Sequence, residues 1–377
     1  MKQEEALPVP LAVPLSGPYL GEREEELVLE VMRSGRLSLG PTIDRFEELI
    51  AERVGAPYAA AVSSGTAGLH LLAITAGIGP GDEVITSPYS FAASANCFVY
   101  EGAVPRFADI DPRTLNLTPA AVEAAITERT KAIVAVDIYG YPCELDELRA
   151  IAGRHGLALI GDSCEAIGAE YKGAPLGSHG VPCVFAFYPN KQMTTGEGGI
   201  VTTHSEEEWR LLRSLRNQGR GDDGGWLEHV RLGFNYRLSD IAAALGIGQV
   251  ERLDEILALR SRAAARYSDL LAGIDGVELP CADNADHVRS WFVYVVLLPD
   301  NETRERVIAT FEREGIGFNR YLPSIHLQPY MRERYGFREG MCPVSEDVSS
   351  RSLALPFFTG IDAAAQARVA EVLAAAL

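Results

Sequence analysis

Long apolar runs are missing from this chain of 377 residues, although 47% of its residues are hydrophobic. No apolar segment approaches the roughly 20 residues that a membrane-spanning helix needs, so the sequence predicts no membrane partner. The first residues, Met1 to Ala6, contain no apolar signal region. We therefore expect a cytoplasmic globular protein, and its length suggests two or three domains.

Cysteine and histidine lack the spacings that bind metals. The six cysteines are scattered without a C-x-x-C pair, and the seven histidines lie far apart. This distribution favours reduced core thiols over disulfides or a zinc site, and we expect no metal.

Lysine is also scarce, because only four of the 34 Lys and Arg residues are lysine: Lys2, Lys131, Lys172 and Lys191. No run of basic residues interrupts a chain whose net charge is −18. An acidic surface of this kind repels the phosphates of nucleic acids. We therefore expect no nucleic-acid partner.

What the sequence does contain is a regular alternation of strand-like apolar runs and helical periods, from about residue 57 to 203. The expected strands include 58–62, 83–86, 133–138, 157–161 and 183–187. Such alternation predicts an α/β fold with a mostly parallel sheet that helices cover on both faces. Ligands of such sheets bind beyond the carboxyl ends of the strands.

The chain after this region predicts a second, smaller unit. Ser239 and Asp240 begin a long helical stretch that we expect to run to about Leu271, as a bridge between domains. We divide the chain into a large domain with an N-terminal arm, residues 1–250, and a small α+β domain, residues 251–377, which includes the bridging helix.

Lys191 has an unusual setting among the four lysines. It follows the apolar run 181–187 and precedes the glycine-rich turn 196–199. An amine at the mouth of a buried strand can be held neutral and can attack an aldehyde. The alternative is an ordinary solvated loop lysine, which is the commoner case.

Other predicted strand ends carry residues that complement such a lysine. Residues 63–68, Ser-Ser-Gly-Thr-Ala-Gly, precede a helix and suit a phosphate, although the same residues also make a common helix cap. Asp162 ends an apolar strand and needs a partner, and Glu165 lies on the same side of the following turn. Phe91 could cover a flat ring or pack in the core. Together these are the parts of a pyridoxal phosphate site, in which an aspartate keeps the pyridine nitrogen protonated.

Five segments of the chain resemble the DegT/DnrJ/EryC1/StrS family of pyridoxal-phosphate-dependent sugar aminotransferases, which have the aspartate-aminotransferase fold (fold type I). The segments are 35–46, 63–69, 162–168, 187–199 and 233–240. The resemblance covers essentially the whole chain, and the blocks around Lys191 and Asn235 are its most specific parts.

The resemblance implies a role for each matching residue. Lys191 would bind the cofactor covalently and move a proton between the cofactor and the sugar carbon. Asp162 would pair with the pyridinium nitrogen, and Phe91 would stack on the ring. Tyr321 and His326 match a loop near the substrate.

The phosphate would be held by Ser64, Gly65 and Thr66 of one subunit and by Asn235 of the other. A homodimer with shared active sites is therefore implied. Two positions depart from the commonest pattern. Ala186 stands where a serine often helps to hold the phosphate, and Glu165 stands where His or Gln often lies near the ring hydroxyl.

The implied reaction is transfer of an amino group from glutamate to a nucleotide-linked keto-sugar, with a lean toward a 4-keto-6-deoxy sugar over a 3-keto sugar. Family members that remove a sugar hydroxyl carry histidine at the position of Lys191, so transamination is favoured over dehydration. A non-enzymatic regulator is disfavoured by the acidic surface. A dinucleotide-binding dehydrogenase is disfavoured because G-x-G-x-x-G does not follow the first strand.

Overall fold

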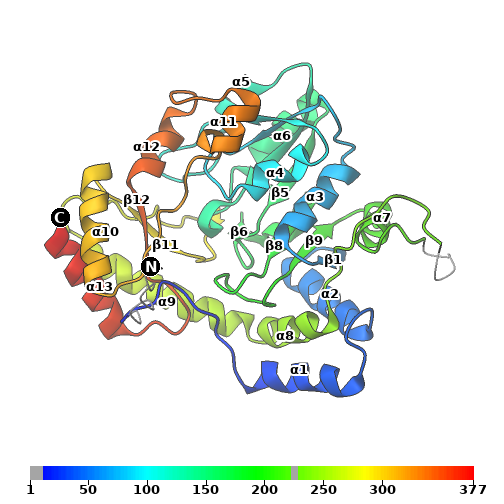
Figure 1. The fold of residues 1–377 in the computed structure, drawn as a ribbon, viewed down its shortest axis with the longest axis horizontal. Helices are drawn as coiled ribbons and strands as arrows, with labels where there is room; N and C mark the ends of the chain where they lie inside the picture. The colour runs from blue at the N-terminus through cyan, green and yellow to red at the C-terminus, as the bar shows by residue number, and fades with distance from the viewer. Residues whose placement is uncertain (1–11, 222–227) are drawn as a thin grey trace, which may run out of the picture.

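The computed structural model describes residues 12–221 and 228–377, which form a sheet-centred body and a smaller lobe (Figure 1). The body contains a seven-stranded sheet in the order β1-β9-β8-β5-β4-β2-β3. Its strands are β1 (Tyr58–Val62), β2 (Glu83–Thr86), β3 (Val104–Phe107), β4 (Thr130–Val136), β5 (Ala158–Asp162), β8 (Cys183–Ala186) and β9 (Gly199–Thr203).

The sheet is mostly parallel, as the sequence predicts. Only β9 runs against its neighbours, β1 and β8, while β5, β4, β2 and β3 pair in parallel. Val136 pairs with Asp162, and Asp162 in turn pairs with Val184. The carboxyl ends of β4, β5 and β8 therefore meet at one edge of the sheet, where a ligand is expected.

Successive residues along a strand pack alternately in two separate hydrophobic cores. Ile133 and Ala135 of β4 enter one core, and Ala132 and Val134 enter the other. This is the period of two that places neighbouring side chains on opposite faces of a sheet. The helices of the body are α1 (Glu22–Ser34), α2 (Pro41–Val54), α3 (Gly65–Thr75), α4 (Ala93–Val99), α5 (Pro119–Ala125), α6 (Leu145–His155), α7 (Glu206–Arg216) and α8 (Asp240–Glu251).

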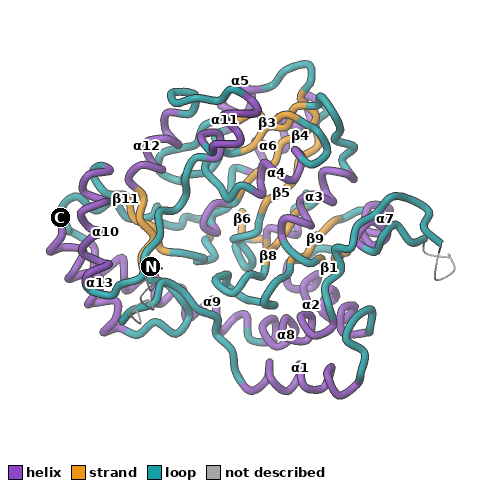
Figure 2. The backbone as a smooth tube through the Cα atoms, in the orientation of Figure 1, coloured by secondary structure: helices purple, strands orange, loops and turns teal. Residues whose placement is uncertain are grey.

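The two faces of the sheet are covered by different helices. The core on one face draws on α2, α6 and α8, and the core on the other draws on α3, α4 and α7. Helix α1 lies along α8 on the outside of the body (Figure 2). Side-chain caps begin several of these helices, as at Thr118, whose hydroxyl accepts a hydrogen bond from Ala121 N.

The smaller lobe has a hydrophobic core of its own around a two-stranded antiparallel sheet. Its elements are β11 (Tyr294–Leu297), β12 (Ser352–Leu355), α9 (Leu253–Leu271), α10 (Asn301–Arg313), α12 (Pro343–Arg351) and α13 (Ala363–Ala376). Helix α11 (Pro329–Tyr335) packs on the body instead, because its Met331 enters the core that α3 and α4 share. Val13 of the N-terminal arm also enters this core and pairs with Ile316.

Short elements complete the described chain. They are β6 (Glu170–Tyr171), β7 (Ala174–Pro175), β10 (His287–Val288) and the 3₁₀ turns η1 (Ile138–Gly140), η2 (Leu176–Ser178) and η3 (Ile325–Leu327). Within residues 12–221 and 228–377, no helix is both long and apolar enough to cross a bilayer.

The long helical stretch predicted from Ser239 and Asp240 to about Leu271 is confirmed, and it consists of two helices. Helix α8 ends at Glu251 and α9 begins at Leu253, because Arg252 leaves the helical geometry with φ −111°. The guanidinium of Arg252 contacts Glu24 of α1. Such a contact with a residue more than 200 positions away in the chain leaves no local trace in the sequence.

Candidate active site

Lys191 lies in the loop that joins β8 to β9, at the carboxyl edge of the sheet. Its side chain is only 13% exposed, and its Nζ lies 3.2 Å from Oε1 of Glu165. The same nitrogen lies 3.9 Å from the ring centroid of Phe292, which is buried. A cation over an aromatic face beside a carboxylate is held in place, so the solvated-loop alternative for Lys191 does not apply.

Asp162 ends β5 and is 5% exposed. Its Oδ2 accepts a 2.6 Å hydrogen bond from Ser94 Oγ, and Ser94 contacts Ser90 Oγ at 2.6 Å. Its Oδ1 accepts a 3.3 Å hydrogen bond from Cys164 N. None of the ion pairs among the described residues involves Asp162. A buried carboxylate that has only neutral donors fits a ring N–H⁺ as its missing partner.

A second carboxylate, Asp137, supports Asp162 from the end of the neighbouring strand β4. Asp137 N donates to Asp162 O at 3.1 Å, and Asp137 Oδ2 accepts from Ser163 Oγ at 2.6 Å. Burial raises the pKa of Asp137 to about 6. Ser163 follows Asp162 directly, so the two strand ends are tied together at the site.

Glu165 is fixed from the side opposite Lys191. Its Oε2 accepts a 2.9 Å hydrogen bond from Tyr139 N. Tyr139 has φ +53° in the turn η1, a left-handed conformation that few non-glycine residues adopt. A Cβ added to the next residue, Gly140, would collide with Ser290 O. The tight turn therefore aims a backbone N–H at the carboxylate.

Tyr321 belongs to the same group. Its hydroxyl lies 3.4 Å from Nδ2 of Asn190, the residue before Lys191. Its ring stacks near those of Tyr139 and Phe292, each with a centroid separation of 6.4 Å. The structure thus places one predicted substrate residue beside the lysine loop.

The predicted phosphate cradle lies at the start of α3. Ser64 is the N-cap, and its Oγ accepts a hydrogen bond from Ala67 N at 3.1 Å. A Cβ on Gly65 would lie 2.8 Å from Ala186 Cβ and 2.8 Å from Cys164 Sγ. Only glycine lets the first turn of α3 come this close to the strand ends beside Asp162.

This helix start opens onto a hollow lined by Ser63, Ser64, Thr66, Ala67, Tyr100 and Tyr236. Hydroxyls and free backbone N–H groups at a helix N-terminus suit an anion. The cradle, the buried carboxylate and the paired lysine lie along the same sheet edge, and this donor set fits pyridoxal phosphate.

Three predicted site residues do not contact Lys191, Asp162 or Glu165 in the structure. Phe91 is 66% exposed, although it follows Ser90, which contacts the Asp162 network. Asn235 is exposed and pairs with Asn217 in an isolated bridge between the end of α7 and the segment before α8. His326 is fully buried, and its Nε2 lies 2.9 Å from Glu346 Oε1. The His326 ring therefore faces α12 instead of Lys191.

Sequence reasoning missed Ser94, Tyr139 and Phe292. Each lies far from Lys191 in the chain, and a single serine or aromatic residue carries no spacing signal. Gln192 was missed as well, although it follows Lys191 directly. Its Nε2 donates to Glu165 O at 2.6 Å and to Ser290 O at 3.1 Å.

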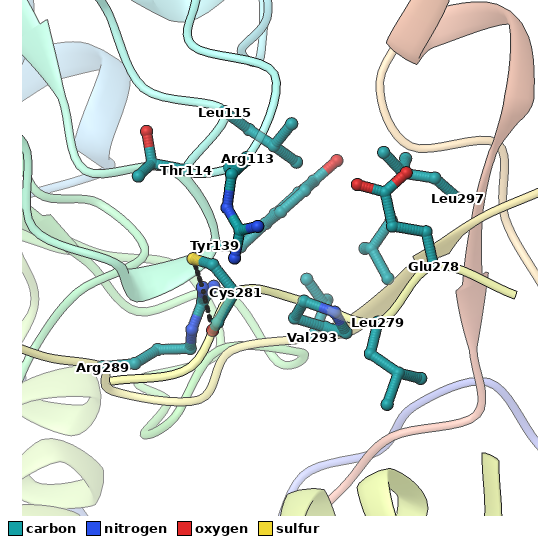
Figure 3. A pocket seen from close by; sticks show the side chains of 12 residues that line it. Arg113, Thr114, Leu115, Tyr139, Glu278, Leu279, Cys281, Arg289, Val293 and Leu297 are labelled. Carbon is teal, nitrogen blue, oxygen red and sulfur yellow. Dashed lines mark hydrogen bonds between the residues drawn. The ribbon is translucent and has the colours of Figure 1, made fainter. Parts of the chain in front are cut away.

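A small cavity of about 20 Å³ lies between the body and the smaller lobe, with Tyr139 as one wall (Figure 3). Nearby, Arg289 donates to Cys281 Sγ at 3.1 Å. A space of this size holds about one water molecule, so it is too small for a cofactor ring. Among the described residues, no group of three or more His, Cys, Asp or Glu could hold a metal ion.

Known proteins match nearly the whole chain. Residues 18–374 match the DegT/DnrJ/EryC1/StrS aminotransferase family. The spore coat polysaccharide biosynthesis protein SpsC of Bacillus subtilis is 38% identical, over 92% of this chain and 92% of its own length. The GDP-perosamine synthase of Caulobacter vibrioides is 40% identical, over 84% and 86%.

The fold is also shared with solved proteins. The structure of S. venezuelae DesV superposes with a TM-score of 0.88 at 32% identity, covering 96% of this chain and 98% of DesV. The expected α/β fold of pyridoxal-phosphate fold type I is confirmed. Solved relatives of the same fold are described in their pyridoxal phosphate form, and pyridoxal phosphate is the cofactor. The chain belongs to the DegT/DnrJ/EryC1/StrS aminotransferase family and is a pyridoxal-phosphate-dependent sugar aminotransferase.

Proposed function

We propose that this enzyme transfers an amino group from glutamate to the keto carbon of a nucleotide-linked 4-keto-6-deoxy sugar. The observation that carries the proposal is the placement of Lys191 against Glu165 at the sheet edge that also holds the buried Asp162. The similarity to a GDP-perosamine synthase supports a nucleotide-linked sugar as the acceptor.

The proposed roles begin with Lys191. Its Nζ must lose a proton before it can attack a carbonyl, and Glu165 Oε1, 3.2 Å away, is placed to accept that proton. After the cofactor is bound, Lys191 would move a proton between the cofactor and the sugar carbon. Tyr321, beside Asn190, would lie next to the sugar.

The cofactor supplies an electron sink for the carbon that loses its proton. Asp162 would hold a proton on the ring nitrogen, and the hydroxyl of Ser94 fixes the orientation of that carboxylate. Ser64, Gly65 and Thr66 would donate to the phosphate from the start of α3. Phe91 would cover the ring.

We also propose a homodimer in which Asn235 reaches the site of the partner. The exposure of Asn235 in the single chain supports this role. Exposed apolar side chains on α1 and on the segment that carries Asn235 support a covered surface, among them Leu29, Met32 and Leu232. A role for His326 in substrate binding would act through Glu346, because its ring is buried.

The division of the chain at residues 250 and 251 stays a proposal, supported by the separate core of the smaller lobe and by the helix break at Arg252. We propose a cytoplasmic location, which the six free cysteines support.

The test uses purified enzyme with pyridoxal phosphate, glutamate and a panel of nucleotide-linked 4-keto and 3-keto sugars. We expect equal amounts of 2-oxoglutarate and amino sugar with a 4-keto substrate. Amination of 3-keto sugars alone would show that the enzyme acts at C3 instead of C4. Release of water without 2-oxoglutarate would show that the reaction is a dehydration and not a transamination. Borohydride reduction and peptide mapping should find the cofactor on Lys191, with Lys131 and Lys172 as internal controls.

A further inference from the structure

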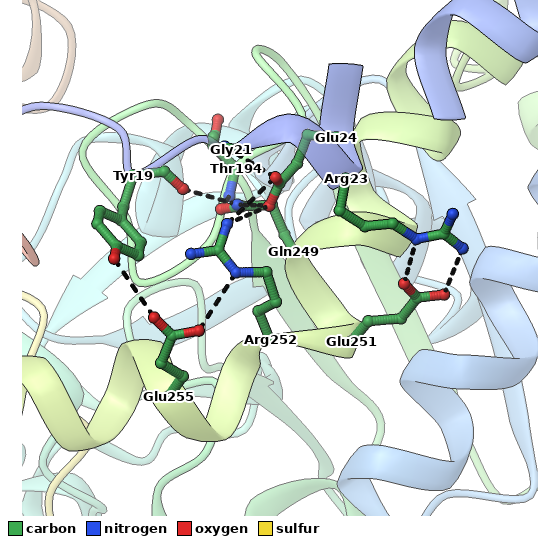
Figure 4. Close-up of polar contacts among 9 residues, drawn as sticks. All are labelled: Tyr19, Gly21, Arg23, Glu24, Thr194, Gln249, Glu251, Arg252 and Glu255. Atoms are coloured by element: carbon green, nitrogen blue, oxygen red, sulfur yellow. Dashed lines mark hydrogen bonds and ion pairs between the residues drawn. The ribbon is translucent and has the colours of Figure 1, made fainter. Parts of the chain in front are cut away.

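Gln249 of α8 is hydrogen-bonded to the loop that carries Lys191. Its side chain is 1% exposed, and its Oε1 accepts a 3.2 Å hydrogen bond from Thr194 N (Figure 4). Thr194 follows Lys191 by three positions and is itself 3% exposed. The contact therefore acts on the backbone of the lysine loop.

The other end of the same amide reaches the N-terminal arm. Gln249 Nε2 donates to Glu24 Oε1 at 2.7 Å and to Tyr19 O at 2.9 Å. Glu24 is 1% exposed, and Arg252 Nη1 lies 3.2 Å from both of its carboxylate oxygens. Gln249 thus links a buried ion pair to the loop of Lys191 (Figure 4).

Two glycines of α8 make this link tight. A Cβ on Gly246 would lie 2.9 Å from Thr195 Cγ2, and a Cβ on Gly248 would lie 2.9 Å from Glu24 Cγ. Helix α8 therefore fits between α1 and the lysine loop with no room for a larger side chain at either position. Packing this close leaves little freedom for Gln249 or for the loop.

Hydrogen bonds within the loop connect the position of Thr194 to that of Lys191. Thr194 Oγ1 donates to Phe187 O at 3.0 Å, and Thr195 N donates to the same oxygen at 3.0 Å. These bonds tie Phe187 to Thr194 and Thr195, so they close the loop that contains Lys191. Within this loop the N of Lys191 donates to Tyr188 O at 2.9 Å. A shift of Thr194 would thus change the direction of the Lys191 side chain.

We propose that Gln249 is a positioning residue for Lys191 and that it couples the N-terminal arm to the catalytic loop through Glu24. The inference rests on the proposed role of Lys191 in binding the cofactor. Loss of the coupling lets the amine drift from Glu165 and from the reacting carbon, while the sugar-binding surface stays unchanged.

The test compares Gln249→Met with Glu251→Gln. Glu251 also joins α8 to α1, but through an exposed pair with Arg23 at 2.8 Å that does not touch the lysine loop. We expect Gln249→Met to lower kcat about ten- to a hundredfold with little change in KM. We also expect it to shift the pH midpoint of the visible absorbance of the lysine-bound cofactor, which depends on the nitrogen of Lys191. Glu251→Gln should leave both readouts at their wild-type values.

An exchange of charge between Gln249 and Glu24 provides the second test. It tests the coupling even if the Gln249→Met variant does not fold. Gln249→Glu alone keeps an acceptor for Thr194 N but sets a second carboxylate against Glu24, so cofactor absorbance and kcat should both change. Adding Glu24→Gln restores one donor and one carboxylate to the pair, and we expect both readouts to recover in part, because Tyr19 O still lacks a donor and Arg252 loses the Glu24 carboxylate.

Two results would overturn the inference. One is a Gln249→Met protein that melts at a lower temperature but keeps its absorbance titration and kcat, which would indicate packing alone. The other is a double variant no better than Gln249→Glu. A cofactor that maps to a lysine other than Lys191 would instead overturn the proposed function, so the two failures are distinguishable.

Discussion

Lys191 and Glu165 form an ion pair, with Nζ and Oε1 3.2 Å apart and both side chains 13% exposed. Glu165 comes from the turn after β5 and Lys191 from the loop after β8, so the pair joins two neighbouring strand ends. Removing one partner of such a buried ion pair lowers the stability of the protein, because the other charge stays buried without a partner.

The first prediction concerns this pair in the absence of cofactor. Glu165→Gln should destabilise the cofactor-free protein by about 1–3 kcal/mol, because Lys191 is left charged beside a neutral amide. The loss should be smaller with cofactor bound, since the nitrogen is then engaged by the cofactor. Thermal unfolding of both forms measures the difference.

The matched control for Glu165→Gln is Asp146→Asn, which breaks the exposed pair of Asp146 with Lys172 at 2.6 Å. Exposed pairs contribute little to stability, so this variant should behave alike with and without cofactor. Equal losses in both forms of Glu165→Gln would show that Glu165 is only a structural residue.

The second prediction concerns the ring nitrogen. Asp162→Asn should keep much of the cofactor affinity but slow proton removal from the substrate by orders of magnitude, because a neutral amide cannot hold the ring protonated. Ser94→Ala keeps the carboxylate and removes only its 2.6 Å donor, so its loss should be smaller. Single-turnover rates measure which of the two variants slows proton removal more. Near-normal turnover in Asp162→Asn would rule out this role.

The third prediction is a pH dependence that arises from Asp137. Its pKa is raised by burial from 3.8 to about 6. Between these values the folded chain binds a proton that the unfolded chain has released, so stability falls as pH rises through this window. The contribution lost by pH 7 is about 3 kcal/mol, on the basis of 1.36 kcal/mol for each pH unit.

Asp137→Asn should remove this slope, since the amide does not titrate and can still bond to Ser163 and to Cys143 N. Relative to wild type, the variant should therefore gain stability from pH 4 to pH 7. Chemical denaturation across this range tests the sign. A stability difference that stays constant with pH would contradict the assignment.

Much of this architecture could be predicted from the sequence because it is encoded locally. Alternating apolar runs mark the strands of the parallel sheet, and a carboxylate or lysine at the end of such a run marks the functional edge. Asp162 and Lys191 were found in this way, and the structure places both at that edge. The start of α3 at Gly65 was likewise visible in its Ser-Gly-Thr cap.

The rest could not be predicted, because it depends on contacts between distant parts of the chain. Phe292 approaches Lys191 from the smaller lobe, and Gln249 reaches Thr194 across 55 positions. The helix break at Arg252 has the same origin, since its partner Glu24 lies in α1. For His326, the resemblance gave a place in the chain but not the buried pairing with Glu346 that turns the ring away.

The last prediction tests whether Asn235 completes the site of a partner subunit. Asn235→Asp sets a carboxylate against the cofactor phosphate and should cost cofactor affinity by like-charge repulsion. Lys191→Ala should abolish turnover in its own subunit. If Asn235 acts across the interface, a mixed dimer of these two variants has one site with both defects and one intact site. Co-refolded protein should regain activity, up to about half of that of a wild-type dimer.

A mixture of Lys191→Ala with Asp162→Asn is the control for this experiment. Both residues lie at the same sheet edge of one chain, so every site in that mixed dimer keeps one defect and no activity should return. Each variant must be inactive alone, and mass measurements must verify that subunits exchange. If exchange is complete and the Asn235→Asp mixture also stays inactive, Asn235 acts within its own subunit or does not contact the cofactor. Recovery in the Asn235→Asp mixture alone would place Asn235 on the opposite side of the interface from Lys191, because no arrangement within a single chain can restore an intact site.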